Sequence, residues 1–80
     1  FRVRNEAMFF LLLDTGMRAG ELCGLKVKDV DPTERRIEVL GKGNKKRMVF
    51  FGRRAARALW AYLRQRGVLN CSENVPLFPA

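Results

Sequence analysis

The 80-residue chain contains no histidine, only two cysteines and a single tyrosine. Without histidine, neither a zinc site nor a general base built on imidazole is expected, and the sequence predicts no metal or other cofactor. Cys23 and Cys71 have no metal-type spacing and make a poor disulfide framework, which favours a reducing, cytoplasmic setting. Cys23 stands close to Leu22 and Leu25, and we expect it to be a small buried apolar group rather than a reactive thiol.

The chain also lacks a long apolar stretch. Residues 7–13 are apolar throughout, but they fall far short of the roughly 20 residues that a membrane span needs. The first residues show no basic segment followed by a long apolar stretch, so we expect no secretory signal. A helix over residues 7–13 would be apolar on every side, which is typical of a helix inside a larger protein. We therefore expect one small domain that is part of a larger protein.

Acidic residues are scarce in the second half of the chain. Lysine and arginine number 16 against 8 aspartates and glutamates, which gives a net charge of +8. Residues 35–80 contain eleven basic and two acidic residues, whereas residues 1–34 contain five and six. This balance predicts a polyanionic partner such as nucleic acid, bound more weakly as the salt concentration rises.

The order of the predicted elements indicates an α+β fold. Helical periodicity and turn residues predict three helices, over residues 4–13, 18–25 and 52–66. Alternation and β-branching predict two strands, over residues 36–40 and 47–51, joined by the glycine-rich turn 41–44. Thr15 is a possible cap of the second helix, and Gly67 is expected to end the third. A turn at Asp31-Pro32 allows a further short strand, so we expect an antiparallel sheet of two or three strands flanked by about three helices.

The helix expected over residues 52–66 has two different faces. At 100° per residue, its apolar side chains gather on one side and should form part of the core: Ala55, Leu59, Tyr62 and Leu63. Arg53, Arg57 and Arg64 fall within about 40° of one another on the other side, with Trp60 at the rim in cation–π reach of Arg57 or Arg64. The stripe is either a solvated helix face or a surface that contacts phosphates. Residues 68–80, with two prolines, are expected to form an extended connector.

Three segments together carry a family resemblance. Residues 15–25, TGMRAGELCGL, resemble the TGxRxxEL box of the tyrosine recombinases, which form the phage integrase family. Residues 39–49, VLGKGNKKRMV, resemble the GKGnKxR hairpin of the same family, and Pro76-Leu77-Phe78 resembles a segment that precedes its next catalytic helix. The resemblance implies that residues 1–80 are the N-terminal portion of a recombinase catalytic domain, with residues 68–80 leading to the remainder.

The resemblance also implies a mechanism and a partner. These enzymes cut double-stranded DNA with a tyrosine nucleophile, form a 3′-phosphotyrosyl link, clamp the phosphate with two arginines and protonate the leaving oxygen with a hairpin lysine. By position in the motifs, Arg18 would be the first clamping arginine, Lys42 the acid and Glu21 the acidic residue that holds the arginine in place. The whole recombinase would oligomerise on DNA, whereas this chain alone is expected to be a monomer.

The residue types suit this chemistry, although other interpretations remain. A planar guanidinium grips two phosphate oxygens at once, and pre-placed donors stabilise charge as it develops. For further contacts with the DNA backbone we expect five basic residues: Lys45, Lys46, Arg47, Arg53 and Arg57. Alternatively, Arg18 is a structural residue paired with Glu21 or Asp14. Lys42 could likewise be a solvated turn lysine, with Lys45 as the acid.

The chain departs from the family in what it lacks. It has no histidine-arginine box, and Tyr62, the single tyrosine, is expected to be a core residue rather than the nucleophile. We therefore expect the chain alone to be inactive. A stand-alone helix-turn-helix-like DNA-binding module, with residues 17–26 as the reading helix, is the alternative function. A small RNA-binding protein ranks last because an aromatic stacking ladder is missing.

Overall fold

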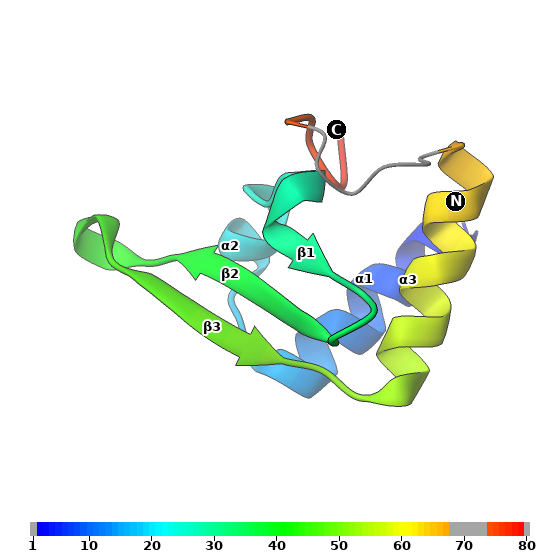
Figure 1. Cartoon of the computed structure of the whole chain (residues 1–80), viewed down its shortest axis with the longest axis horizontal. Helices are drawn as coiled ribbons and strands as arrows, with labels where there is room; N and C mark the ends of the chain where they lie inside the picture. The colour runs from blue at the N-terminus through cyan, green and yellow to red at the C-terminus, as the bar shows by residue number, and fades with distance from the viewer. Residues whose placement is uncertain (1, 68–73, 80) are drawn as a thin grey trace.

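The computed structural model describes residues 2–67 and 74–79. The elements follow in the order α1 (Arg2–Thr15), α2 (Ala19–Cys23), η1 (Val27–Asp29), β1 (Val30–Asp31), β2 (Arg36–Leu40), η2 (Lys42–Asn44), β3 (Lys46–Phe50) and α3 (Arg53–Arg66). The three strands form an antiparallel sheet in the order β1-β2-β3, and α1 and α3 pack against each other beside it (Figure 1). The expected α+β fold with a small antiparallel sheet and three helices is confirmed.

The hairpin of β2 and β3 forms where local sequence predicts it. β2 has the expected bounds, and β3 begins and ends one residue before the expected 47–51. Ile37 pairs with Val49 and Val39 with Arg47, and this register buries Ile37 and Val39 against the helices. The turn contains the short helix η2, in which Gly43 and Asn44 have φ values of 75° and 59°. Glycine and asparagine tolerate this left-handed backbone, so the turn closes without strain.

The first two helices differ from the prediction at their ends. α1 extends two residues further in each direction, while α2 has five residues instead of the eight predicted. The prediction that Thr15 caps α2 is wrong, because Arg18 is the residue at its N-cap. The Thr15 hydroxyl instead donates a hydrogen bond to the Leu11 carbonyl at 2.6 Å and accepts one from the Met17 N–H at 3.3 Å. Thr15 therefore ends α1 and does not begin α2.

The core combines one face of each helix with the inner face of the sheet. In α3 the predicted apolar face is buried, and Gly67 ends this helix with φ 75° as expected. In α1 only Ala7 and Leu11 are fully buried, whereas Phe9 and Leu13 are more than half exposed. Within this chain, α1 is therefore buried on one side only. The expectation that Cys23 is buried is wrong: its thiol is free and exposed, because Leu22 takes the inward position of α2.

The C-terminal segment returns to the core over the part that the structure describes. The Leu77 N–H donates to the Leu25 carbonyl at 2.9 Å, and the Val27 N–H donates to the Val75 carbonyl at 2.8 Å. Leu77 and Phe78 are buried, and the Phe78 ring stacks on Tyr62 at 5.0 Å. Residues 75–78 thus pack on the core of this chain, and the connector to a recombinase remainder over residues 68–80 stays a prediction. Residues 68–73 and 80 of that expected connector lie outside the described residues.

Tyr62→Phe should test how firmly this segment is held. The Tyr62 hydroxyl donates to the Leu77 carbonyl at 2.7 Å inside the core, and the Arg66 guanidinium donates to the same oxygen at 2.7 Å. Because Arg66 still satisfies the carbonyl in the variant, we expect the free energy of unfolding to fall by only about 1 kcal/mol. Urea denaturation measures the change, and Trp60→Phe on the exposed side of α3 is the control. A loss as small as that of the control would show that the hydroxyl does not hold the segment.

Candidate functional site

Arg18 lies in the short loop between α1 and α2. Gly16 has φ 68°, which reverses the chain after α1, and the side chain of Met17 is buried in the core. Arg18 follows with an extended backbone, φ −77° and ψ 152°, and its side chain is exposed. The buried Met17 thus anchors a loop that leaves the Arg18 guanidinium accessible to solvent.

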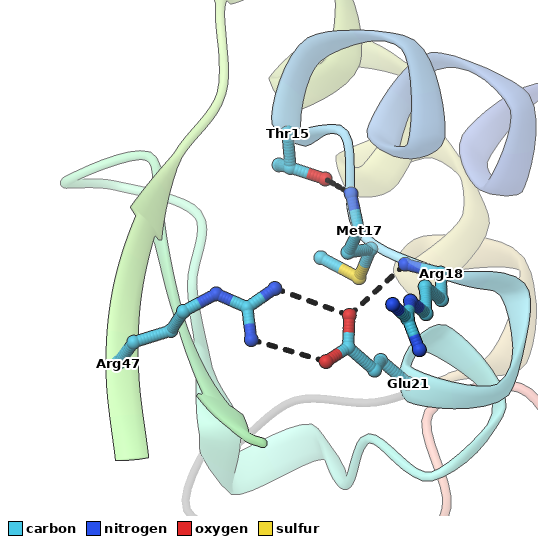
Figure 2. A network of polar contacts seen from close by, with 5 residues as sticks. All are labelled: Thr15, Met17, Arg18, Glu21 and Arg47. Atoms are coloured by element: carbon cyan, nitrogen blue, oxygen red, sulfur yellow. Dashed lines mark hydrogen bonds and ion pairs between the residues drawn. The ribbon is translucent and has the colours of Figure 1, made fainter. Parts of the chain in front are cut away.

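Glu21 fixes the main chain of this loop. Its Oε1 atom accepts a hydrogen bond from the Arg18 backbone N–H at 3.0 Å (Figure 2). This contact begins α2, because the carboxylate satisfies an N–H group that the short helix itself leaves unpaired. Glu21 therefore supports Arg18 through the backbone. The four ion pairs found among the described residues do not include the Arg18 guanidinium, so its pairing with Glu21 or Asp14 is not observed.

Arg47 joins the hairpin to the same carboxylate. Its Nη1 atom donates to Glu21 Oε2 at 3.0 Å and its Nη2 atom to Oε1 at 3.1 Å, a two-pronged pair that reaches from β3 to α2 (Figure 2). The Glu21 side chain is only 19% exposed, so the pair is partly shielded from water. A Cβ atom on Gly41 would lie 3.2 Å from Arg47 Nη1, so the glycine leaves room for this arginine. The Glu21 carboxylate in this way links residues 15–25, which contain Arg18, to the hairpin of β2 and β3.

The network changes the acidity of Glu21. The side-chain hydrogen bonds from Arg47, followed by the bond from the Arg18 N–H, lower the pKa of Glu21 from 4.5 to about 2. The same contact raises the pKa of Arg47 above its ordinary value. Both groups are consequently charged over the whole neutral range, and the link between α2 and β3 persists there.

Stability should therefore depend on pH through Glu21. Because folding depresses its pKa, its contribution is fully present above about pH 4.5 and is lost as the pH falls towards 2. We expect the free energy of unfolding of the chain to fall over this window. In Glu21→Gln the slope of the unfolding free energy against pH should be smaller, by an amount that corresponds to at most one proton taken up on unfolding. Urea denaturation between pH 2 and 6 measures both slopes, with Glu34→Gln as a control for loss of a surface carboxylate. Equal slopes for Glu21→Gln and the native chain would contradict the network.

Lys42 lies at the start of η2, in the turn of the hairpin. The Gly41 N–H donates to the Lys45 carbonyl at 2.7 Å and closes the turn, which projects beyond α2 at the far end of the sheet (Figure 1). The side chain of Lys42 lies outside the described part of the structure. Its main chain shares the hairpin with Arg47, which contacts Glu21 directly. The structure thus ties the segment that contains Lys42 to the loop that contains Arg18.

The other hairpin cations differ in their availability. Lys46 Nζ lies 3.1 Å from Glu38 Oε1, and Arg47 is bound to Glu21, so both already have an acidic partner. Lys45 is exposed and has no ion pair among the described residues. A groove of about 320 Å³ runs beside these residues between α2 and the hairpin, lined by Glu21, Glu38 and Lys46 among others. Of the three predicted phosphate contacts in the hairpin, Lys45 is the one without a competing carboxylate.

Arg53 and Arg57 take no part in the network of Arg18, Glu21 and Arg47 among the described residues. Both are exposed on α3; the Gly52 N–H, next to Arg53, donates to Asp14 Oδ2 at 2.7 Å, and Arg57 lies one turn further along the helix. The expected cation–π contact of Trp60 with Arg57 or Arg64 is not among those found in the described residues. The two contacts present are Arg54 over Phe10 and Arg66 over Tyr62.

The helix-turn-helix alternative does not fit the observed second helix. α2 has five residues, too few for a reading helix, and Met17, Leu22 and Leu25 of the proposed reading segment are buried.

No group of three or more potential metal ligands occurs within residues 2–67 and 74–79. None of the helices in this range is long and apolar enough to cross a membrane.

Comparison with known proteins identifies the class of protein to which this fold and site belong. Residues 1–80 match the family model described as the phage integrase family, and the chain belongs to this family. It is 52% identical over 63 residues to the tyrosine recombinase XerC of Corynebacterium efficiens, which covers 79% of this chain and 20% of the relative. It is also 52% identical over 61 residues to XerC of Mycobacterium tuberculosis, covering 76% of this chain and 20% of the relative.

A solved structure supports the same conclusion for the fold. The crystal structure of XerA recombinase superposes with a TM-score of 0.81 and 37% sequence identity, covering 98% of this chain and 28% of that one. The resemblance to tyrosine recombinases is therefore confirmed. The chain spans about a fifth of the length of the XerC relatives it matches.

Proposed function

We propose that this chain is part of a site-specific recombinase that cuts and rejoins double-stranded DNA through a 3′-phosphotyrosyl intermediate. In this proposal Arg18 clamps the scissile phosphate and Lys42 protonates the leaving oxygen. The observation that supports it is the Glu21 carboxylate, which binds the Arg18 main chain on one side and Arg47 of the hairpin on the other. Two motifs that are far apart in the sequence are thereby held in one assembly.

The proposed reaction is a transesterification at phosphorus. A tyrosine outside this chain attacks: its hydroxyl proton passes to a base that also lies outside this chain, its oxygen forms a bond to phosphorus, and the bond from phosphorus to the 5′ oxygen breaks. Negative charge spreads over the non-bridging oxygens in the transition state, where the exposed Arg18 guanidinium can donate to two of them. The proton of the Lys42 ammonium passes to the departing 5′ oxygen, which leaves as a hydroxyl.

The nucleophile has to come from elsewhere in the whole protein. Tyr62 is 4% exposed, and its hydroxyl donates to the Leu77 carbonyl inside the core, so it cannot approach a phosphate without unfolding. We accordingly propose that the chain alone is inactive and monomeric, and that it binds duplex DNA only weakly. Lys45 would contact the DNA backbone directly, whereas Lys46 and Arg47 would first have to leave their carboxylate partners.

A covalent-trapping experiment tests the proposed function. A full-length recombinase that contains this chain is incubated with a pool of random-sequence duplex DNA and then denatured in detergent. The proposal predicts a protein–DNA complex that survives denaturation and that carries the protein on a 3′ phosphate. Bound DNA that is released completely on denaturation, with no cut strands, would contradict it. The duplex enriched by trapping then serves as the substrate for the variants discussed below.

A further inference from the structure

The positive charge of α3 is the largest feature that the proposed site does not use. The helix contains five arginines and no acidic residue. Arg54 lies over the Phe10 ring, and Arg66 binds the Pro76 and Leu77 carbonyls. The other three are exposed and, among the residues that the structure describes, have no ion pair and no side-chain hydrogen bond. With the half-exposed Trp60 between them they form a surface that we call the α3 stripe: Arg53, Arg57, Trp60 and Arg64.

The α3 stripe is straight and continuous. With 100° and about 1.5 Å per residue, its four side chains lie within about 60° of one another along about 16 Å of helix. Arg57, Trp60 and Arg64 also line a shallow hollow of about 310 Å³. Trp60 is 41% exposed and comes between Arg57 and Arg64 along the helix, so an aromatic residue separates two arginines on this surface.

The α3 stripe faces away from the core of this chain. The buried residues of α3 centre about 130° around the helix from the stripe, and the helix packs on α1. The Arg53 end of the stripe lies near the end of α1, because the neighbouring Gly52 N–H donates to Asp14 Oδ2 at 2.7 Å, whereas Arg57, Trp60 and Arg64 follow further along α3.

We propose that the α3 stripe binds single-stranded nucleic acid, with one unpaired base stacked on Trp60 and the neighbouring phosphates on Arg57 and Arg64. Arginines along a groove with an exposed aromatic ring between them are the combination that such strands require, since every base has a flat face to stack. A duplex keeps its bases inside the helix and would offer Trp60 only its charged backbone. An acidic peptide could pair with the guanidinium groups but need not supply a planar ring for the indole.

The chain offers a direct optical test, because Trp60 is its only tryptophan. The 80-residue protein is titrated at low salt with short oligothymidylate, oligouridylate, a DNA hairpin duplex or polyglutamate, while tryptophan fluorescence is followed. Stacking should quench the emission with a single strand and much less with the duplex or the polypeptide. Quenching by either single strand supports the proposal, and the strand that binds more tightly identifies the source as DNA or RNA.

Variants separate the α3 stripe from the hairpin. Trp60→Ala should weaken binding of a labelled oligothymidylate by about fivefold or more, whereas Trp60→Phe should keep most of the affinity. Arg57→Gln or Arg64→Gln should each reduce the salt dependence, the slope of log K against log salt, by about 0.7. Lys45→Gln in the hairpin is the matched control, and its effect on this binding should be small.

Three results would overturn the proposal: no quenching by either strand, equal quenching by duplex or polyglutamate, or an effect of Lys45→Gln as large as that of Arg57→Gln. Circular dichroism confirms that each variant is folded before binding is measured. The outcome is independent of strand cleavage, because none of the stripe residues belongs to the proposed catalytic site. Failure of cleavage with intact quenching, or the reverse, would therefore distinguish the two proposals.

Discussion

Arg18→Ala, made in a full-length recombinase that contains this chain, should lower the rate of strand cleavage by about 10² to 10³. Loss of one pre-placed donor to a developing negative charge typically has an effect of this size. DNA binding should change little, since the same guanidinium interacts more weakly with the ground-state phosphate. Arg18→Lys should recover only part of the rate, because an ammonium group cannot grip two oxygens in one plane.

Single-turnover cleavage of the duplex enriched by the trapping experiment measures this effect without interference from product release. Arg18 is exposed and donates only its backbone N–H to Glu21, so the substitution should leave the loop and the Glu21–Arg47 pair in place. Arg2→Ala, at the exposed start of α1, is the matched control and should cleave at the native rate. A native rate for Arg18→Ala would remove Arg18 from the mechanism.

Lys42→Ala has the second large expected effect, a loss of about 10² to 10⁴ in the cleavage rate. Without an acid, the 5′ oxygen must leave as an alkoxide, which is a far poorer leaving group than the neutral alcohol formed when the oxygen is protonated. Lys45→Ala tests the competing assignment, since Lys45 is exposed in the same turn. It should weaken DNA binding with a smaller change in the rate at saturating DNA. The reverse result, with Lys45→Ala as the slower enzyme, would move the acid to position 45.

The parts of the fold that were correctly predicted are those that local sequence determines. β2, the left-handed turn at Gly43 and the end of α3 at Gly67 each follow from patterns within a few residues. The buried face of α3 likewise follows from its spacing. Cys23 was misjudged because a helix of only five residues gives too little periodicity to decide which side faces inward.

The long-range contacts of the candidate site could not be predicted in the same way. Glu21 and Arg47 are 26 positions apart, and the sequence predicts separate roles for them, support of Arg18 by Glu21 and contact with DNA by Arg47. Only the register of β3, which directs Arg47 towards α2, brings them together. The return of residues 75–78 is similar, because it depends on free main-chain groups at Leu25 and Val27 that the sequence does not reveal. Motifs thus predict candidate residues of the site but not how those residues are held.

The separate roles proposed for Arg18, as phosphate clamp, and Lys42, as leaving-group acid, can be tested by replacing the 5′ bridging oxygen of the substrate with sulfur. A thiol has a pKa of about 8.5, so a sulfur leaving group departs as a thiolate and needs no acid. Single-turnover cleavage of this substrate by Lys42→Ala should approach the native rate, whereas Arg18→Ala should remain slow, because charge still develops on the non-bridging oxygens. If sulfur rescued both variants equally, or left Lys42→Ala as slow as with oxygen, then the two residues would not act as clamp and acid at one phosphate.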